Sequence, residues 1–380
     1  MNRLIIIGNG FDLARNLKTR YSDFIRTYIK ETIQNSTNRT LKNLSFNVEL
    51  VNTETKRKIA IIAAQSGYYM SNSNEFYETI INYFLSHKYT KENYNSFFMP
   101  RSGSIFERAL KNIRLLGWAD IEAIYYKMLC EISMQLKTGY EEESKERLHL
   151  LNSEMEELKK QLIKYLLVEQ KNATRFLDWD LVNTPFINKD FTSTKDIDCI
   201  GKKPENCSIL NFNYTNIFND ISYSANVIKI HGDINNPNSI IFGYGDEKDK
   251  YSSVLEKLND NEYLKYIKSF GYLQNSEYNK LIGFIEQGQF QICIVGHSCS
   301  LSDKTLLNYI FQHPNCKSIK IYYHEKIDET TKEKTDNFNE ILYNISRNMD
   351  DKIKLRERVI NKSFLHTKID QILEYDNASC

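Results

Sequence analysis

Short apolar runs that end at turn residues predict the strands of this chain. In the first run, residues 4–7, four apolar side chains follow one another and stop at Gly8. An unbroken branched run of this length is typical of a strand buried on both faces of a parallel sheet. Because a lone buried strand cannot satisfy its backbone hydrogen bonds, we expect it to pair with later strands. Five later runs predict such strands, at residues 208–212, 227–230, 239–242, 290–295 and 318–323.

Helical periodicity dominates the region between the first strand and the later ones. Apolar residues recur at steps of three and four along residues 118–132 and again along 151–165, as on the buried face of an amphipathic helix. The second stretch carries Glu and Lys on its other face and predicts one arm of an antiparallel helical hairpin. Further helices are expected at residues 215–223, 250–286 and 302–311.

The order of these elements predicts an α/β fold. Helices that alternate with buried strands favour a Rossmann-like, mostly parallel sheet, and the long helical region favours a large all-helical insertion. We expect residues 1–50 and 200–330 to form a split nucleotide-binding domain and residues 51–199 to form the insertion. Residues 331–380 are expected to form a C-terminal helical segment that packs on the sheet domain.

Charge and hydropathy narrow the expected partners. The chain has 380 residues, of which 50 are Lys or Arg and 49 are Asp or Glu, and its net charge is +1. This balance gives no electrostatic footprint for nucleic acid or for an anionic membrane, so neither partner is expected. The apolar run near Met1 is too short for a signal peptide, and no segment approaches the roughly 18 apolar residues of a membrane span. We therefore expect a cytoplasmic protein.

The cysteines indicate neither disulfides nor zinc. Seven cysteines are scattered along the chain without a C-x-x-C pair, which favours a reducing compartment over a disulfide framework or a zinc knuckle. His297 and Cys299 are close in sequence, but they lack a carboxylate partner at the spacing of metal ligands. We expect no metal site.

A glycine turn follows the first strand. In Gly8-Asn9-Gly10 two residues lack a Cβ, so backbone N–H groups can converge on an anion where a helix begins. The dinucleotide pattern G-x-G-x-x-G would require a third small residue at position 13, which is Leu13. The turn alone therefore leaves two interpretations open, a phosphate loop and a tight structural turn with Asp12 as the helix N-cap.

Polar residues and glycines also follow three of the later strands. In open α/β sheets ligands bind beyond the carboxyl ends of the strands, so these residues are expected to lie at one edge of the sheet with the glycine turn. They are Asn213, Tyr214 and Thr215, then His231 and Gly232, and finally Gly296, His297 and Ser298.

Together these motifs resemble the bacterial abortive-infection AbiH family over nearly the whole chain. Their order is also similar to that of the wider sirtuin-like NAD-binding fold, with a Gly-x-Gly loop, a strand that ends in Asn, a His-Gly pair and a late Gly-x-Ser. Arg15-Asn16 stands where AbiH-like sequences have His-Gly, and the zinc-binding cysteines of deacylating sirtuins are absent. The resemblance therefore implies NAD chemistry without protein deacylation. It is carried by Gly8-Asn9-Gly10-Phe11-Asp12 with residues 17–24, by residues 211–215 and 230–232, and by residues 296–298 with Asp303.

The resemblance implies an antiphage effector that binds NAD and hydrolyses it to ADP-ribose and nicotinamide. Cleavage of this N-glycosyl bond passes through an oxocarbenium-like state and requires a pocket, a positioned water or hydroxyl, and a base. His231 suits the base, since a histidine imidazole ordinarily titrates near pH ~6.5. Asn213 suits a residue that holds a ribose hydroxyl or the water. The residues expected to bind the nucleotide are Gly8, Asn9, Gly10, Phe11, Asp12, Tyr214, Thr215, Gly232, Gly296, His297, Ser298 and Asp303.

Two acidic residues need separate treatment. A carboxylate beside a pyrophosphate would repel it, so Asp12 is expected to cap the helix after the glycine turn or, less favourably, to bind a ribose hydroxyl that faces away from the phosphates. In the helical region, Glu122 follows the start of a predicted helix at residue 118. It is a further candidate to reach the pocket.

Two other functions stay open. The same pocket could sense NAD, ADP-ribose or another nucleotide without turnover, as a signalling module in phage defence. A base such as His231 beside the glycine turn favours the enzyme, because a sensor needs no base catalyst. A nuclease is disfavoured by the neutral charge and by the lack of a carboxylate cluster for metal ions. A phage-derived trigger and a homo-oligomer are both compatible with the sequence.

Overall fold

The chain divides into two compact units in a computed structural model. One unit consists of Met1–Thr19, Leu166–Ser252 and Tyr266–Cys380, and the other of Arg20–Tyr165 and Ser253–Lys265. The domain boundaries expected from the sequence stay a prediction. The structure describes residues 1–35, 41–42, 46–48, 98–100, 103–110, 118–136, 139–173, 180–194, 197–216, 225–327 and 333–364.

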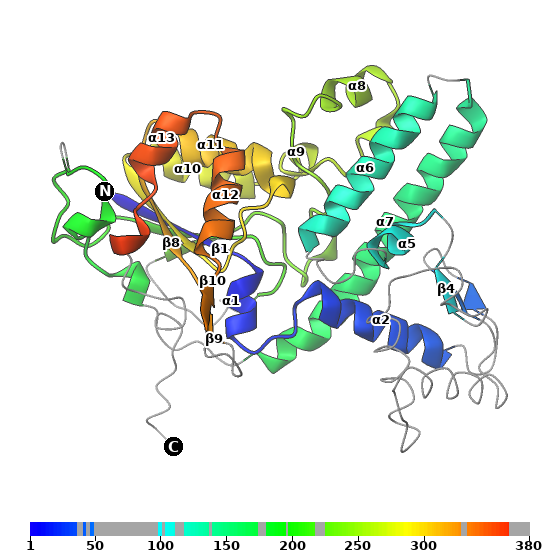
Figure 1. Cartoon of the computed structure of the whole chain (residues 1–380), viewed down its shortest axis with the longest axis horizontal. Coiled ribbons are helices and arrows are strands. Elements are labelled where there is room, and N and C mark those ends of the chain that lie inside the picture. Colours follow the sequence, from blue (N-terminus) through cyan, green and yellow to red (C-terminus); the bar gives the residue numbers. More distant parts are fainter. Residues whose placement is uncertain are drawn as a thin grey trace, which may run out of the picture. The chain divides into compact units, whose positions relative to one another are not determined.

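The first unit is built on a five-stranded parallel sheet with the order β6-β5-β1-β7-β8. Figure 1 labels β1 and β8 of this sheet. The first strand of the chain lies at its centre, where Ile5 is in register with Ile209 on one side and with Cys293 on the other. This pairing confirms that the first apolar run joins the later strands. The strands are β1 (Asn2–Ile7), β5 (Cys207–Asn211), β6 (Ala225–Lys229), β7 (Phe290–Val295) and β8 (Cys316–Tyr322).

Strand β1 contributes to two hydrophobic clusters, one on each face of the sheet. Leu4 and Ile6 belong to the larger cluster, whereas Ile5 and Ile7 belong to the smaller one. Because successive side chains of a strand point to opposite faces, a strand covered on both sides needs an unbroken apolar run. The pattern of residues 4–7 therefore follows directly from the central position of β1.

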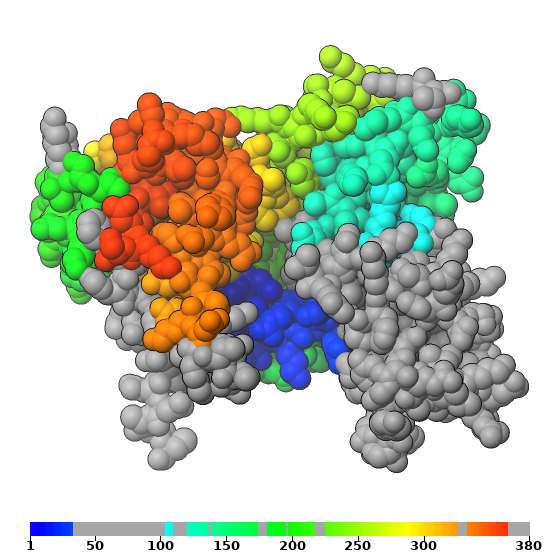
Figure 2. Space-filling view, in the orientation of Figure 1, coloured from blue at the N-terminus to red at the C-terminus, as the bar shows by residue number. Residues whose placement is uncertain are grey.

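Helices from the last third of the chain cover the face of Leu4 and Ile6. Residues of α10, α11 and α12 share the larger hydrophobic cluster with the sheet, and Leu355 of α13 packs against it. Figure 1 shows these helices on one side of the strands, and Figure 2 shows α12 and α13 at the surface there, in orange and red. The helices are α10 (Glu277–Glu286), α11 (Lys304–Gln312), α12 (Phe338–Asn348) and α13 (Lys352–Arg358).

Between β6 and β7 the predicted strand at residues 239–242 was wrong, and the predicted helical region is helical only in part. Residues 239–242 form no sheet strand; instead, the Ile241 N–H donates to the carbonyl of His231 at 3.0 Å, and Tyr244 exchanges backbone hydrogen bonds with Tyr266 and Lys268. The expected helical region, residues 250–286, is interrupted where Ile267 is extended and forms an isolated bridge with Tyr244. Its helical parts are α8 (Ser252–Lys257), a 3₁₀ turn at Asn261–Tyr263, α9 (Lys268–Gly271) and α10.

The second unit is mainly helical. The long helices α6 (Trp118–Leu136) and α7 (Glu141–Glu169) confirm both periodic stretches, and the buried Glu154 of α7 accepts hydrogen bonds from the N-terminal N–H groups of α5, those of Ile105 and Phe106. The prediction of an all-helical insertion was wrong, because β4 lies within residues 51–199 and pairs with β3. The remaining elements are α2 (Tyr21–Asn35), β2 (Leu41–Lys42), β3 (Phe46–Val48), β4 (Phe98–Pro100) and α5 (Ile105–Leu110).

The first unit contains one more helix and a small antiparallel sheet. The helix is α1 (Asn9–Ala14), and the sheet pairs β9 (Glu325–Ile327) with β10 (Lys334–Asp336). Most of the helix predicted at residues 215–223 lies outside the described residues. In the described ranges, no helix combines the length and the hydropathy that a bilayer crossing requires.

Candidate functional site

The strand order of the sheet reverses between β1 and β7. From β1 the chain continues outward to β5 and β6 on one side, and then returns to place β7 and β8 on the other. Such a reversal opens a crevice beyond the carboxyl ends of the two central strands, where open α/β sheets bind ligands. The glycine turn after β1 and the loop after β7 both begin at this point.

These two loops contact each other through glycines. The Gly10 N–H donates to the carbonyl of Gly296 at 2.8 Å, and the Phe11 N–H donates to the carbonyl of Gly8 at 2.8 Å. A Cβ added to Gly8 would lie 2.6 Å from Cδ2 of His297, and one added to Gly296 would lie 2.4 Å from the Phe11 nitrogen. The glycines thus allow two backbones to touch, and the N–H groups of Gly10 and Phe11 are bonded within the protein.

Replacement of Gly296 by alanine should destabilise the protein strongly. Gly296 has a φ of +67°, and the left-handed backbone and the close contact together should lower the free energy of unfolding by about 2–5 kcal/mol. Gly283 is the matched control, because a Cβ there meets nothing within 4 Å and Gly283→Ala in α10 should stabilise by about 0.4–1 kcal/mol. Thermal unfolding of both variants measures the difference. Equal melting temperatures would contradict this account of the glycine contact.

The first polar cluster surrounds Asp12 of α1. Its carboxylate accepts hydrogen bonds from Nδ2 of Asn213 at 2.8 Å and from Oγ1 of Thr215 at 2.6 Å, and the same Nδ2 donates to the carbonyl of Gly8 at 3.0 Å. The predicted helix cap was wrong, because α1 begins at Asn9 with Gly8 as its N-cap and has no side-chain cap. Through its hydrogen bonds with Asn213 and Thr215, Asp12 instead connects the helix that follows β1 to the segment that follows β5.

The pKa of the Asp12 carboxyl is higher than that of an ordinary Asp. Burial raises the pKa of Asp12 to about 7, although the hydrogen bonds from Thr215 and Asn213 act in the opposite direction. Near neutral pH the cluster can therefore hold either a carboxylic acid or a carboxylate.

Asp12→Asn should change how stability depends on pH. An unfolded Asp titrates near pH ~4 and the folded Asp12 near pH 7, so between these values the unfolded chain has released a proton that the folded chain retains. The contribution of Asp12 to stability is therefore lost as the pH rises, by about 4 kcal/mol between pH 4 and pH 8. Relative to wild type, Asp12→Asn should be more stable at pH 8 than at pH 5 in urea unfolding. The exposed Asp198 provides the control, Asp198→Asn, and a pH-independent effect of Asp12→Asn would refute the assignment.

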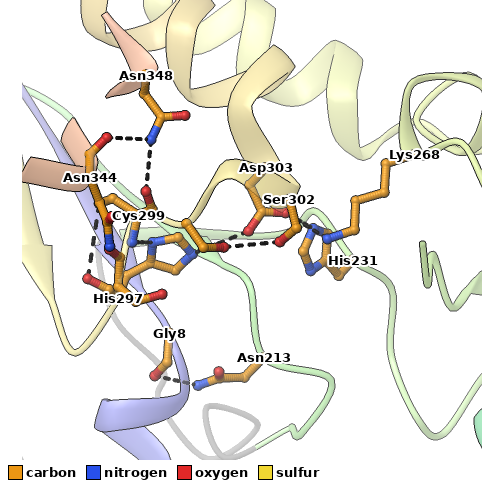
Figure 3. Close-up of polar contacts among 12 residues, drawn as sticks. Gly8, Asn213, His231, Lys268, His297, Cys299, Ser302, Asp303, Asn344 and Asn348 are labelled. Atoms are coloured by element: carbon orange, nitrogen blue, oxygen red, sulfur yellow. Dashed lines mark hydrogen bonds and ion pairs between the residues drawn. The ribbon is translucent and has the colours of Figure 1, made fainter. Parts of the chain in front are cut away.

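The second polar cluster joins His231, Lys268 and Asp303 (Figure 3). Oδ1 of Asp303 lies 3.1 Å from Nε2 of His231 and accepts a hydrogen bond from Nζ of Lys268 at 2.8 Å. Oδ2 of Asp303 lies 3.9 Å from Nε2 of His297. All four side chains are buried. Four segments thus bring one carboxylate, one ammonium and two imidazoles together: the loop after β6, the start of α9, the loop after β7 and the start of α11.

Two ionisation states follow from this geometry. Burial alone would raise the pKa of Asp303, but Lys268 and His231 outweigh burial and hold that pKa well below its usual range. Burial lowers the pKa of His297 to about 4, so this imidazole is neutral near pH 7. Its Nδ1 accepts a hydrogen bond from the Cys299 N–H at 3.0 Å, so the ring proton of His297 is on Nε2.

Aromatic rings frame His231. The ring of Phe212 meets it edge-on at 5.1 Å, and the rings of Tyr214 and Tyr272 stack on it at 6.0 and 6.3 Å. Phe212 also lies 4.2 Å from the ring of His297. These contacts restrict the imidazole to one orientation and connect it to the segment that carries Asn213.

Asparagines of α12 hold the loop after β7. Nδ2 of Asn344 donates to the carbonyl of Ser298 at 2.9 Å, and Nδ2 of Asn348 donates to the carbonyl of Cys299 at 2.7 Å. Cys299 has a φ of +54°, which is rare outside glycine. The side-chain amides therefore fix a strained turn that presents His297.

The structure brings together most of the residues singled out from the sequence. Asn213, Thr215 and Asp12 form one cluster with Gly8; His231, His297 and Asp303 form the other; and Gly10 contacts Gly296. Gly232, with a φ of +90°, allows the turn after His231, because an added Cβ would lie 2.2 Å from the carbonyl of Ser239.

Five other candidates have the following contacts and surroundings. Oδ1 of Asn9 accepts a hydrogen bond from Oγ1 of Thr19, and the side chain of Phe11 belongs to the smaller hydrophobic cluster. The Tyr214 hydroxyl donates to the carbonyl of Ile241, and Ser298 is exposed. Glu122 is buried in α6 of the second unit. The binding roles of these residues stay predictions.

Sequence reasoning missed Lys268 and the two asparagines of α12. Lys268 lies in residues 250–286, where the sequence predicts helices, and no local pattern indicates that this lysine is buried. No three His, Cys, Asp or Glu side chains among the described residues are arranged to hold a metal ion.

A comparison with protein families gives a match over most of the chain. Residues 4–325 match the model of the family described as bacteriophage abortive infection AbiH. No curated protein matches the chain. The matched range contains both polar clusters and all of the parallel sheet except Asn2 and Arg3, the first two residues of β1. The chain therefore belongs to the bacteriophage abortive infection AbiH family.

Proposed function

We propose that this AbiH protein binds NAD at the edge of its parallel sheet and hydrolyses the bond between nicotinamide and ribose during abortive infection. The observation that carries the proposal is that polar residues after β1, β5, β6 and β7 form two clusters at the carboxyl edge of a sheet whose strand order reverses between β1 and β7. If the five strands of the sheet are numbered 1 to 5 as they follow one another in the chain, the order β6-β5-β1-β7-β8 becomes 3-2-1-4-5. Rossmann-type nucleotide-binding folds have this order. This order supports a Rossmann-like and sirtuin-like relationship.

Asn213 is suited to hold a hydroxyl or a water. Its Nδ2 donates to both the Gly8 carbonyl and the Asp12 carboxylate, so both amide hydrogens are used. The remaining polar atom, Oδ1, can only accept a hydrogen bond. A ribose hydroxyl or the attacking water can donate to it, whereas a phosphate oxygen cannot.

His231 supplies the base in this proposal. Its imidazole takes a proton from a water molecule, the water oxygen bonds to C1′ of the ribose, and the C1′–N bond breaks as its electron pair returns to the nicotinamide ring. Neutral nicotinamide leaves, and ADP-ribose and one proton are the other products. His231 is buried beside the aromatic rings of Phe212, Tyr214 and Tyr272, which limits access of other water molecules.

The glycine turn contributes differently from the usual phosphate loop. The Gly10 N–H is bonded to Gly296 and the Phe11 N–H to Gly8, so neither N–H fits a pyrophosphate without a rearrangement. In the proposal the glycines bring the β1 and β7 loops together, and the nicotinamide ribose is held by the polar clusters.

Calorimetric titration with NAD tests the binding step. Wild-type protein should bind NAD, and Asn213→Ala should weaken binding about 2- to 12-fold, the effect of one lost hydrogen bond. Asn226 of β6 is exposed and Asn226→Ala is the matched control. Binding without release of nicotinamide would favour the alternative function, a nucleotide sensor, and no binding at all would refute an NAD pocket.

A further inference from the structure

The two nitrogens of the His231 imidazole have different surroundings. Nε2 lies 3.1 Å from Oδ1 of Asp303, and the Tyr272 hydroxyl is 3.5 Å from the same nitrogen. Oδ1 of Asp303 also receives the Lys268 ammonium at 2.8 Å. The side chains of His231, Lys268 and Asp303 are 6%, 1% and 7% exposed. One ring nitrogen is therefore directed into a buried ion pair.

The direction of the hydrogen bond between His231 and Asp303 is fixed by charge. With Lys268 at 2.8 Å, the Asp303 carboxylate is ionised, and an ionised carboxylate can only accept. Nε2 of His231 must then donate, so it carries the ring proton. In a neutral imidazole the lone pair is left on Nδ1, the nitrogen on the other side of the ring.

We propose that His231 accepts the proton of the attacking water through Nδ1, and that Asp303 and Lys268 are positioning residues that fix this tautomer. The inference rests on the proposed NAD hydrolysis for its chemical step. In that step the water proton is transferred to Nδ1 while the water oxygen bonds to C1′ and nicotinamide leaves. The resulting imidazolium is stabilised by the adjacent Asp303 carboxylate.

The surroundings of His231 support this assignment. Tyr214 and Tyr272 stack on the ring, Phe212 meets it edge-on, and the ring of Phe212 also contacts the ring of His297. Of these groups and the ion pair, only Asp303 presents a carboxylate to the imidazole. Figure 3 shows Lys268 approaching Asp303 on the side away from His297.

Lys268 has a separate role from Asp303. It starts α9, and its backbone N–H donates to the Tyr244 carbonyl at 2.9 Å, which anchors the residue. Its ammonium compensates the buried charge of the Asp303 carboxylate at 2.8 Å, and an uncompensated buried charge is costly. Lys268 therefore keeps Asp303 ionised and in place, and Asp303 in turn orients His231.

The test uses the double variant Lys268→Met/Asp303→Asn, which removes both charges together and leaves no unpaired buried ion. With NAD as substrate, kcat for nicotinamide release should fall about 10²–10⁴-fold with little change in KM, because the base is misoriented while the binding groups remain. His149→Ala, at an exposed histidine of α7, is the control. A double variant with unchanged kcat would overturn the inference.

The ring proton can also be located directly. Long-range ¹H–¹⁵N spectra of protein labelled at histidine, with the His231 signals assigned by their absence in His231→Gln, should show the proton on Nε2 in wild type. The double variant should show a mixture of tautomers or a proton on Nδ1. A wild-type proton on Nδ1 would overturn the inference. If wild type releases no nicotinamide, the hydrolase proposal fails, but the position of the ring proton still decides the positioning role.

Discussion

His231→Ala is expected to lower the rate of nicotinamide release from NAD by about 10²–10⁴-fold, the usual contribution of a general base. The imidazole is buried and bonded to Asp303. Alanine has no group that could accept the proton of the attacking water in its place. NAD binding should persist, because Asn213 and the glycine contact remain. Initial rates and calorimetric binding, measured on the same preparations, separate the two effects.

The matched control for this variant is His149→Ala, since His149 is exposed on α7. It should have wild-type rates. Two results would argue against a catalytic imidazole: His231→Ala with an undiminished rate, or a rate loss that follows a loss of NAD binding in equal proportion.

Lys268→Met is expected to have the largest effect on stability. It leaves the Asp303 carboxylate buried without its ammonium partner, and loss of one member of a buried ion pair costs about 3–5 kcal/mol. Asp303→Asn should also destabilise the protein, because it leaves the Lys268 ammonium buried without its carboxylate partner. The double variant should recover much of the loss, since no isolated charge remains. Urea unfolding of all four proteins gives the coupling energy between the two residues.

An exposed ion pair provides the comparison for this double-mutant cycle of Lys268 and Asp303. Lys145 pairs with Glu141 on the surface of α7, where solvent screens the interaction. Lys145→Met should leave the urea midpoint essentially unchanged. Additive effects of Lys268→Met and Asp303→Asn would show that the buried pair is not coupled, contrary to the geometry.

Part of the fold could be predicted because it depends on local pattern. The unbroken apolar run at residues 4–7 has the composition that a strand buried on both faces requires, and β1 is the central strand. The periodic stretches of α6 and α7 are likewise local signals. Residues 239–242 show where this reasoning fails, because an apolar run also occurs in a buried connection whose backbone bonds to His231.

The candidate site was predictable in position but not in detail. The residues that follow the strands could be expected at one edge of the sheet, because parallel strands end there together. Asp12 was assigned to a helix cap because a cap is a local signal, whereas its real partners, Asn213 and Thr215, come from 201 and 203 residues away. The pairing of Lys268 with Asp303 also depends on tertiary structure, so no spacing in the sequence predicts this ion pair.

The most direct test of the account is a time course of products from NAD with purified wild-type protein. We expect nicotinamide and ADP-ribose to form in equal amounts, at a rate that is proportional to protein concentration and is lost in His231→Ala. Intact NAD after prolonged incubation at high protein concentration, with His149→Ala behaving identically, would contradict the central claim that this site hydrolyses NAD.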